Sequence, residues 1–350
     1  MNVAVLIVNW NGGGLLRRCL QSLLNQQRHA DRIIVVDNAS TDDSLRQAAR
    51  ELAGTELIRL ATNAGFAAAN NIAARAAGDC DAIALLNPDA FPEPHWLGSL
   101  VAAAERHPDV SAFASQMVLA SSPNQLDGAG DSYHVSGRAW RNGHMAPRAS
   151  GPTDDVEVFA ACAAAALYRR EAFEDAGGFD EQYFSYFEDV DLGFRMRLRG
   201  HRCLYVHSAV VHHMSSAIGG YRSDFAVYYG ERNAVWTFFK NMPTPLLLLY
   251  LPQHLALNLA SLFYYPLRGQ GGAVIRAKLD AVRGLPSLLR TRKAVQATRR
   301  VNAWALRRAL RRGFAVPYTR RYSSAPIAAA TGVLTLVLAT LVGACGLAAA

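Results

Sequence analysis

Short hydrophobic runs alternate with helical patterns over the first hundred residues. Four runs are rich in β-branched or aliphatic side chains and are typical of buried strands: residues 3–8, 33–36, 56–60 and 82–86. Between them, leucines recur at helical spacing over residues 15–24, and residues 66–77 form an alanine-rich helical pattern. This alternation predicts an α/β fold, a mainly parallel sheet with helices on both faces.

Polar residues come directly after several of the predicted strands. Asn9 ends the first run, Asp37 ends the second, and Asn87 and Asp89 follow the fourth. Open parallel sheets bind their ligands beyond the carboxyl ends of the strands. We therefore expect the binding site at this edge of the sheet, with these side chains around it.

The pattern is less regular in the middle of the chain. Residues 121–155 are polar and glycine-rich, which predicts loops over the edge of the sheet. Helices are expected over residues 169–175 and 188–199, the second of them ended by Gly200 as a left-handed cap. A further strand is expected over residues 202–211.

The last hundred residues differ in composition from the rest. Residues 241–267 lack Asp, Glu, Lys and Arg but contain four prolines, which favours an interfacial or re-entrant membrane segment over a straight spanning helix. Residues 268–321 carry fifteen Lys or Arg against the single acid Asp280. Residues 325–350 are 26 uncharged residues. At ~1.5 Å per residue they are long enough to span ~30 Å of hydrocarbon.

Length, charge and cysteine content narrow the function classes. For 350 residues we expect about two domains, with a catalytic body over 1–240, a hydrophobic then basic helical region over 241–321, and a candidate transmembrane anchor over 325–350. The net charge of +8 hides a local balance of +14 in residues 268–321, which leaves −6 for residues 1–267. Beside apolar segments, such a basic stretch favours anionic membrane lipid over nucleic acid as its partner.

The five cysteines lie far apart and include no C-x-x-C pair. A disulfide framework or a zinc site is therefore not expected, and the default is a reduced, cytosolic face of the membrane. The N-terminal apolar run is short and has no preceding positive charge, so we interpret it as a strand and not as a targeting signal.

The carboxylates at the strand ends are the first candidates for chemistry. Asp37 can accept a hydrogen bond from a base or ribose lying across the sheet, or it can form an Asx turn that leads into a helix. Asp89 can bind a hard divalent cation, which prefers oxygen ligands, or belong to an ordinary Asn-Pro-Asp turn. Neither residue by itself shows whether it binds a ligand or only forms a turn.

Three carboxylates lie in the first turn of the helix expected over residues 188–199: Glu188, Asp189 and Asp191. They can pair with the helix dipole, but three acids exceed what capping requires. Glu188 and Asp191 share a helical face at i, i+3, whereas Asp189 points about 100° away. We expect one acid to face a pocket while the others support the helix.

Two further features are compatible with an anionic ligand. The loop from Asn63 to Gly65 leads into a helix start that can cradle a phosphate. His212 and His213 follow a predicted strand and can add a nitrogen ligand or a phosphate contact. The chain contains neither a G-x-G-x-x-G nor a G-x-x-x-x-G-K-[ST] motif, which disfavours a dinucleotide fold and a P-loop.

Six segments occur in one order within residues 3–217: 8–11, 36–42, 63–71, 85–90, 177–181 and 186–192. Their residues include Asn-Trp-Asn, Val-Asp-Asn-Ala-Ser-Thr-Asp, Leu-Asn-Pro-Asp-Ala and Phe-Glu-Asp-Val-Asp-Leu. Together they resemble the family 2 glycosyltransferases of the GT-A fold, and within them the rhamnosyltransferase-like branch.

The resemblance implies a role for each matching position. Asp37 looks like the residue that contacts the nucleotide base, with Asn9 and Asn38 near it. Asp89 looks like the metal-binding acid of the family's D-x-D motif, whose first aspartate is replaced here by Asn87. Asp189 looks like the catalytic base.

His213 matches the family's metal-binding histidine, although the adjacent His212 leaves the register open. The other residues within or beside these segments that we assign to substrate binding are Asn63, Gly65, Asn70, Glu188 and Asp191.

The implied activity is inverting, metal-dependent transfer of a hexose. The donor is a nucleotide-diphosphate sugar, with dTDP-rhamnose favoured, and UDP-galactofuranose or UDP-GlcNAc as alternatives. The acceptor is a lipid-linked or polysaccharide glycan of the cell envelope, reached at the cytoplasmic face of the membrane. A Mg²⁺ or Mn²⁺ ion neutralises the leaving diphosphate, and one carboxylate deprotonates the acceptor hydroxyl.

Two other classes of protein are alternatives to a glycosyltransferase. A sugar-nucleotide pyrophosphorylase shares the sheet architecture but needs a glycine-rich loop with Arg and Lys after the first strand, and Asn9 to Gly14 has neither cation. A non-catalytic membrane scaffold has no need for Asp89 and Asp189 together.

Overall fold

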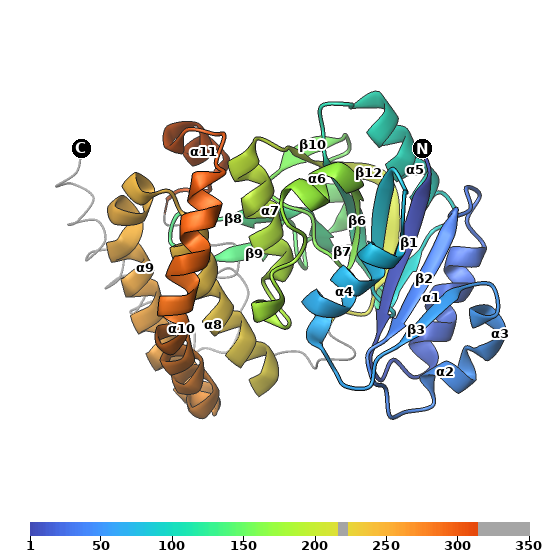
Figure 1. Ribbon diagram of the computed structural model, residues 1–350, viewed down its shortest axis with the longest axis horizontal. Coiled ribbons are helices and arrows are strands. Elements are labelled where there is room, and N and C mark those ends of the chain that lie inside the picture. Colours follow the sequence, from blue (N-terminus) through green and yellow to red (C-terminus); the bar gives the residue numbers. More distant parts are fainter. Residues whose placement is uncertain (216–222, 314–350) are drawn as a thin grey trace.

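The structure is a computed structural model that describes residues 1–215 and 223–313 (Figure 1). The expected anchor at 325–350 lies outside these residues. The N-terminal part alternates strands and helices in this order: β1 (Val3–Asn9), α1 (Gly14–Leu24), β2 (Arg32–Asp37), α2 (Ser44–Gln47), α3 (Ala49–Leu52), β3 (Glu56–Arg59), α4 (Gly65–Ala76) and β4 (Ala82–Leu86). Strand β1 pairs in parallel with β2 and β4, and β2 pairs in parallel with β3. The expected alternation is confirmed.

The second half of the sheet is built differently. Its elements follow in chain order: β5 (Ala90–Pro92), α5 (Trp96–Arg106), β6 (Ala112–Leu119), β7 (Ser122–Ala129), β8 (Asp131–Tyr133), β9 (Ala139–Arg141), β10 (Val156–Val158), β11 (Ala165–Arg169), α6 (Arg170–Asp175), α7 (Glu188–Arg199) and β12 (Cys203–His213). Strand β11 lies antiparallel between β4 and β6, while β12 runs parallel to β6. The sheet order β10-β12-β6-β11-β4-β1-β2-β3 is therefore mixed.

The alternation of side chains along β1 shows why helices cover both faces of the sheet. Val3, Val5 and Ile7 pack into one core with α1 and α5. Ala4 and Leu6, which point to the opposite face, pack into a second core with α4, α6 and α7. Because successive strand residues face opposite sides, a fully apolar strand has to be buried between two helical layers.

The expectation of loops over residues 121–155 is wrong in part, because β7, β8, β9 and a short 3₁₀ turn (Arg148–Ser150) form there. Strand β7 follows β6 as an antiparallel partner, and its first residues are exposed and polar. Backbone pairing with a neighbouring strand, rather than an alternating hydrophobic pattern, makes this segment a strand.

Four helices follow the sheet: α8 (Asp224–Asn241), α9 (Thr244–Tyr264), α10 (Gly271–Ala297) and α11 (Ala303–Ala309). They form the side of the molecule opposite to α1, α2 and α3 (Figure 1). Two short 3₁₀ turns, Glu181–Tyr183 and Pro266–Arg268, precede α7 and follow α9.

Helix α9 contradicts the expectation of a re-entrant break within residues 241–267, whereas their interfacial position stays a prediction. It is one continuous helix that contains Pro252 and begins with Pro245 in its first turn. Proline is tolerated in a first turn because the N–H that it lacks has no helical partner there. Among the residues that the structure describes, the stretch Thr244–Arg268 is the one helical segment long and apolar enough to cross a bilayer, on length and composition alone.

Candidate active site

A pocket of about 440 Å³ opens at the carboxyl ends of the parallel strands. Its wall includes eight of the residues singled out from the sequence: Asn38, Asn63, Gly65, Asn87, Asp89, Glu188, Asp189 and His213. Residues from β1 and β12 meet there with the loops after β2, β3 and β4 and the start of α7. The structure thus has a pocket at the edge of the sheet where the binding site is expected.

One wall of the pocket is a hydrogen-bonded loop around Asn38. The Asn38 side chain donates to Oδ1 of Asn63 at 2.9 Å and accepts from the backbone N–H of Ala64 at 2.8 Å. Gly65 starts α4 with φ of +84°, and a Cβ atom there would lie 2.5 Å from the Phe184 ring. Only glycine fits this position, because both the left-handed backbone and the close approach of Phe184 exclude a side chain.

Asn9, Asp37 and Asn70 do not line the pocket. Asn9 is fully buried and donates to Oδ1 of Asp37 at 3.2 Å and to Oγ of Ser44 at 2.9 Å. The Asn70 side chain donates to the carbonyl of Phe66 in its own helix at 2.9 Å. Asn9 and Asp37 link the ends of β1 and β2 behind the pocket wall, whereas the Asn70 bond lies within α4. Direct contact of these side chains with a substrate stays a prediction.

Asp89 and His213 form a buried pair in the pocket. Nε2 of His213 lies 3.4 Å from Oδ1 of Asp89, while Nδ1 lies 2.7 Å from Oδ2 of Asp127. Burial opposes the charge on the imidazole, but Asp127 and Asp89 outweigh it and raise the pKa of His213 to about 9. His212 contacts Glu93 at 3.0 Å, so of the two histidines it is His213 that faces Asp89 and the pocket.

Asp127 is a site residue that the sequence analysis missed. It is fully buried on β7, where it contacts His213 and Ser215 and pairs with Arg141 and His144. Burial raises the pKa of its carboxyl, but these cationic and hydrogen-bonding partners outweigh burial and hold that pKa well below its usual range. No sequence signal marks it, because it lies in the segment that was expected to be a loop.

The Asp89–His213 pair fits a divalent cation. One imidazole nitrogen and one carboxylate face each other at 3.4 Å with the pocket beside them, and both side chains are more than nine-tenths buried. Asp127 holds the second ring nitrogen, which is the usual outer partner of a metal-binding histidine. A bound cation would take the place of the proton on Nε2 of His213, because imidazole binds a metal ion in its neutral form.

Helix α7 presents its three acids to two different environments. Its bounds and its left-handed Gly200 cap, with φ of +94°, confirm the expectation from the sequence. Glu188 and Asp189 line the pocket. Asp191 is fully buried and does not line the pocket, so its direct contact with a substrate also stays a prediction.

Asp191 is the centre of a buried charge network. Its Oδ1 lies 2.7 Å from Nζ of Lys240 and accepts from Nδ2 of Asn241 at 2.7 Å, and its Oδ2 accepts from Nε of Arg195 at 2.8 Å. Burial alone raises the pKa of this carboxyl, but Lys240, Arg195 and Asn241 outweigh it and lower the pKa to about 2. The network joins α7 to α8 and positions the start of α7.

Asp189 is held as a carboxylate that faces the pocket. Oδ2 accepts from the backbone N–H of Ala163 at 3.0 Å, and Oδ1 accepts from the N–H of Val190 at 2.8 Å. Burial raises the pKa of Asp189 above its ordinary value, and these two N–H donors oppose the rise. The neighbouring Glu188 has an even more unfavourable environment, because burial and the charge of Asp189 both raise its pKa. Of the two acids, Asp189 has the donors that stabilise a charged form.

The loop before α7 has a strained backbone. Phe184, Tyr186 and Phe187 all have positive φ, between +65° and +68°, although none of them is glycine. The side chain of Asn233 on α8 donates to the carbonyls of Tyr183, Ser185 and Tyr186, at 3.0, 3.0 and 2.7 Å. This clamp holds in place a loop whose residues form the pocket wall next to Asp189.

The N-terminal half of the chain matches a known family. Residues 4–177 match the model of Glycosyl transferase family 2. The chain belongs to the family 2 glycosyltransferases. The match covers the strand ends and the pocket loops up to α6, which include Asn38, Gly65 and Asp89.

Two curated relatives share part of the sequence. The N-acetylglucosaminyl-diphospho-decaprenol L-rhamnosyltransferase of Mycobacterium tuberculosis is 29% identical over 261 residues, which is 66% of this chain and 85% of the relative. The O-antigen biosynthesis protein RfbC of Myxococcus xanthus is 30% identical over 219 residues, 58% of this chain and 16% of the relative. These names agree with the rhamnosyltransferase-like branch.

Solved structures share the fold. GalNAc-T7, solved with UDP, GalNAc and Mn²⁺, superposes with a TM-score of 0.55 at 17% identity over 69% of this chain and 48% of that chain. The mannosyltransferase PcManGT of Pyrobaculum calidifontis, solved with GDP-Man and Mn²⁺, gives 0.53 at 18% identity over 80% and 87%. This family 2 enzyme therefore has the expected GT-A fold.

Proposed function

We propose that this glycosyltransferase moves a sugar, rhamnose in the first place, from a nucleotide-diphosphate donor to a lipid-linked glycan acceptor with inversion at the anomeric carbon. The observation that carries the proposal is one pocket holding the buried Asp89–His213 pair together with the carboxylate of Asp189. The printed activity of the mycobacterial relative, which names a rhamnosyl group and a diphospho-decaprenol lipid, supports this choice of donor sugar and acceptor.

The reaction needs one base. Oδ1 or Oδ2 of Asp189 takes the proton of the acceptor hydroxyl as its oxygen attacks the anomeric carbon. The bond to the diphosphate breaks as the new glycosidic bond forms, so a single displacement inverts the configuration. The N–H groups of Ala163 and Val190 keep the carboxylate oriented during this step.

Asp89 and His213 are the residues that would hold a divalent cation, with Mg²⁺ or Mn²⁺ proposed. When bound, such an ion supplies a positive charge that neutralises the leaving diphosphate. Asp127 fixes the histidine ring, and Arg141, which also lines the pocket, adds positive charge of its own.

The donor is tested by measuring transfer from dTDP-rhamnose, UDP-galactofuranose and UDP-GlcNAc to a polyprenyl-diphosphate sugar. We expect turnover with dTDP-rhamnose to exceed the other two. If turnover is higher with UDP-galactofuranose or UDP-GlcNAc, the proposal of a glycosyltransferase stands but that of rhamnose as the sugar is contradicted. If none of the three donors is either used for transfer or hydrolysed, the proposed glycosyltransferase activity is contradicted.

Replacing Asp89 with alanine removes the carboxylate of the proposed cation site. We expect Asp89→Ala to raise the donor KM and to weaken the dependence of activity on Mg²⁺ or Mn²⁺, because the diphosphate loses its bridge. Steady-state kinetics over a range of metal concentrations measure both. If the unaltered protein keeps its full activity in EDTA, the proposed dependence on a divalent cation is contradicted.

The proposed location is the cytoplasmic face of the membrane, with α9 and α10 against anionic lipid. Both helices expose large apolar side chains, including Leu255, Leu259 and Phe263 on α9 and Leu279 and Val282 on α10. The inner side of α9 reaches the pocket region, since Nδ1 of His254 lies 2.8 Å from the carbonyl of Ser136 in the β8–β9 turn. A lipid-linked acceptor held at this surface would be delivered next to the pocket.

The lipid contact is tested with three exposed arginines of α10: Arg276, Arg283 and Arg290. Changing all three to glutamine should weaken binding to vesicles that contain phosphatidylglycerol, because each basic residue near an anionic surface contributes ~1 kcal/mol. Co-sedimentation at low and high salt measures the loss. The matched control changes Arg17, Arg46 and Arg50, which are exposed on α1 to α3, and should bind as before. Equal loss in both variants would contradict a specific lipid-facing surface.

A further inference from the structure

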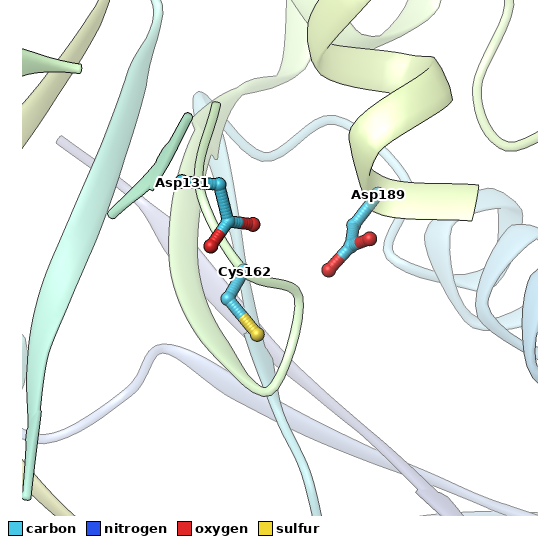
Figure 2. A group of neighbouring side chains, drawn as sticks. All are labelled: Asp131, Cys162 and Asp189. Atoms are coloured by element: carbon cyan, nitrogen blue, oxygen red, sulfur yellow. The ribbon is translucent and has the colours of Figure 1, made fainter. Parts of the chain in front are cut away.

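Three side chains that can bind a metal converge beside the proposed base. Asp131 at the start of β8, Cys162 before β11 and Asp189 in the first turn of α7 place ligand atoms within 4.8 Å of one another. Figure 2 shows the two carboxylates and the thiol directed toward a common point. All three residues line the pocket. They lie far apart in the sequence, which is why no motif marks them.

Asp131 supplies the observation that points to a ligand. It is 4% exposed, and its Oδ1 has no hydrogen-bond partner among residues 1–215 and 223–313. Its backbone is fixed, because its N–H donates to Ala160 at 2.9 Å and its carbonyl accepts from Phe159 at 3.0 Å. A buried carboxylate oxygen without a donor is unfavourable. The fold nevertheless holds this oxygen toward Cys162 and Asp189.

The donor set selects the class of ligand. Mg²⁺ and Mn²⁺ prefer oxygen ligands, whereas a thiolate beside two carboxylates suits Zn²⁺ or its thiophilic analogue Cd²⁺. A tetrahedral zinc places its ligand atoms ~3.5 Å apart, so the three side chains have to close by about an ångström. The fourth position would open into the pocket. Burial raises the pKa of all three groups, and the positive charge of the nearby Arg141 opposes this rise.

We propose that Asp131, Cys162 and Asp189 form a binding site for a zinc-class divalent cation, separate from the Asp89–His213 pair. Binding replaces the thiol proton of Cys162, and any proton on Asp131, with the metal and releases these protons to solvent. Occupancy takes the lone pairs of Asp189, so the cation blocks sugar transfer. This inhibitory effect rests on the proposed function, whereas the binding itself does not.

The binding is tested by titrating the full-length, metal-free protein with Cd²⁺ and following the ultraviolet absorption of the cadmium–thiolate bond. We expect one cadmium–thiolate bond per chain from this site. Cys162→Ser should abolish the band, and Asp131→Asn should weaken the apparent affinity at least tenfold. Cys19→Ser is the matched control, because that thiol is buried in the core on the α1 side and should leave the titration unchanged.

Asp89→Asn separates the two cation sites and should also leave the cadmium band unchanged. A band that persists in Cys162→Ser, or one lost in Asp89→Asn, would overturn the proposal. In a second measurement, Zn²⁺ is added to the transferase assay in excess Mg²⁺. We expect Zn²⁺ to inhibit sugar transfer by the unaltered protein. In Asp131→Asn, the zinc concentration needed for the same inhibition should be at least tenfold higher. Equal inhibition of the unaltered protein and the variant would overturn the blocking role. A protein that binds Cd²⁺ at Cys162 but transfers no sugar would contradict the proposed function and support the site.

Discussion

Asp189→Asn is expected to lower the rate of sugar transfer by ~10²-fold or more, the usual contribution of a positioned general base. The amide has nearly the same shape as the carboxylate, but it cannot take the proton of the acceptor hydroxyl. Donor binding should be retained, since Asp89, His213 and the Asn38 loop are unchanged. The measurement is kcat with the preferred donor, together with donor affinity from equilibrium binding.

Two variants serve as references for this result. Asp43→Asn changes an exposed aspartate whose one ion pair among the described residues is with Arg46. This variant should transfer sugar at the normal rate. Glu188→Gln tests the other acid of the pocket. If Glu188→Gln loses ~10²-fold in transfer rate while Asp189→Asn keeps a near-normal rate, Glu188 is the catalytic base.

The pH profile is a further check on the base. Burial raises the pKa of Asp189, so the active carboxylate form exists above that raised value and is lost as pH falls through it. The acid limb of kcat/KM should therefore lie above the ordinary aspartate pKa of ~3.9.

Asp191→Ala is expected to lower the free energy of unfolding by about 3 kcal/mol, because it leaves Arg195 and the fully buried Lys240 without their shared carboxylate. This lies at the lower end of the usual range, since Lys240 keeps Asp180 at 2.6 Å. The effect appears as a lower denaturant midpoint with an unchanged slope.

Asp43→Ala is the matched control, since removing an exposed ion pair costs at most ~1 kcal/mol. The contribution of Asp191 also has a defined pH window. Its pKa is about 2 in the folded chain and ~3.9 when unfolded. Its stabilising effect is therefore fully present above the unfolded value and is lost as pH falls toward the folded value. Equal midpoints for Asp191→Ala and Asp43→Ala at neutral pH would contradict the structural role.

The sequence by itself determined the N-terminal half of the fold and part of the pocket wall. Strands β1 to β4 and helix α7 follow from local periodicity, and Gly200 ends α7 because a left-handed cap favours glycine. Asn87 and Asp89 could be assigned to the site because the carboxyl ends of parallel strands meet at one edge of the sheet. The roles of Asn38 and Asp189 came from the resemblance to the family.

The tertiary structure decided what depends on long-range pairing and burial. Asp189 and Asp191 both lie in the first turn of α7. Asp191 is paired with the buried Lys240 of α8, whereas Asp189 lines the pocket. Asp127 became part of the site through the pairing of β7 with β6. Asp131 and Cys162 meet Asp189 only after three separate segments have packed together. Local pattern reports the spacing of side chains along one element, whereas charge partners and ligand sets are made between elements.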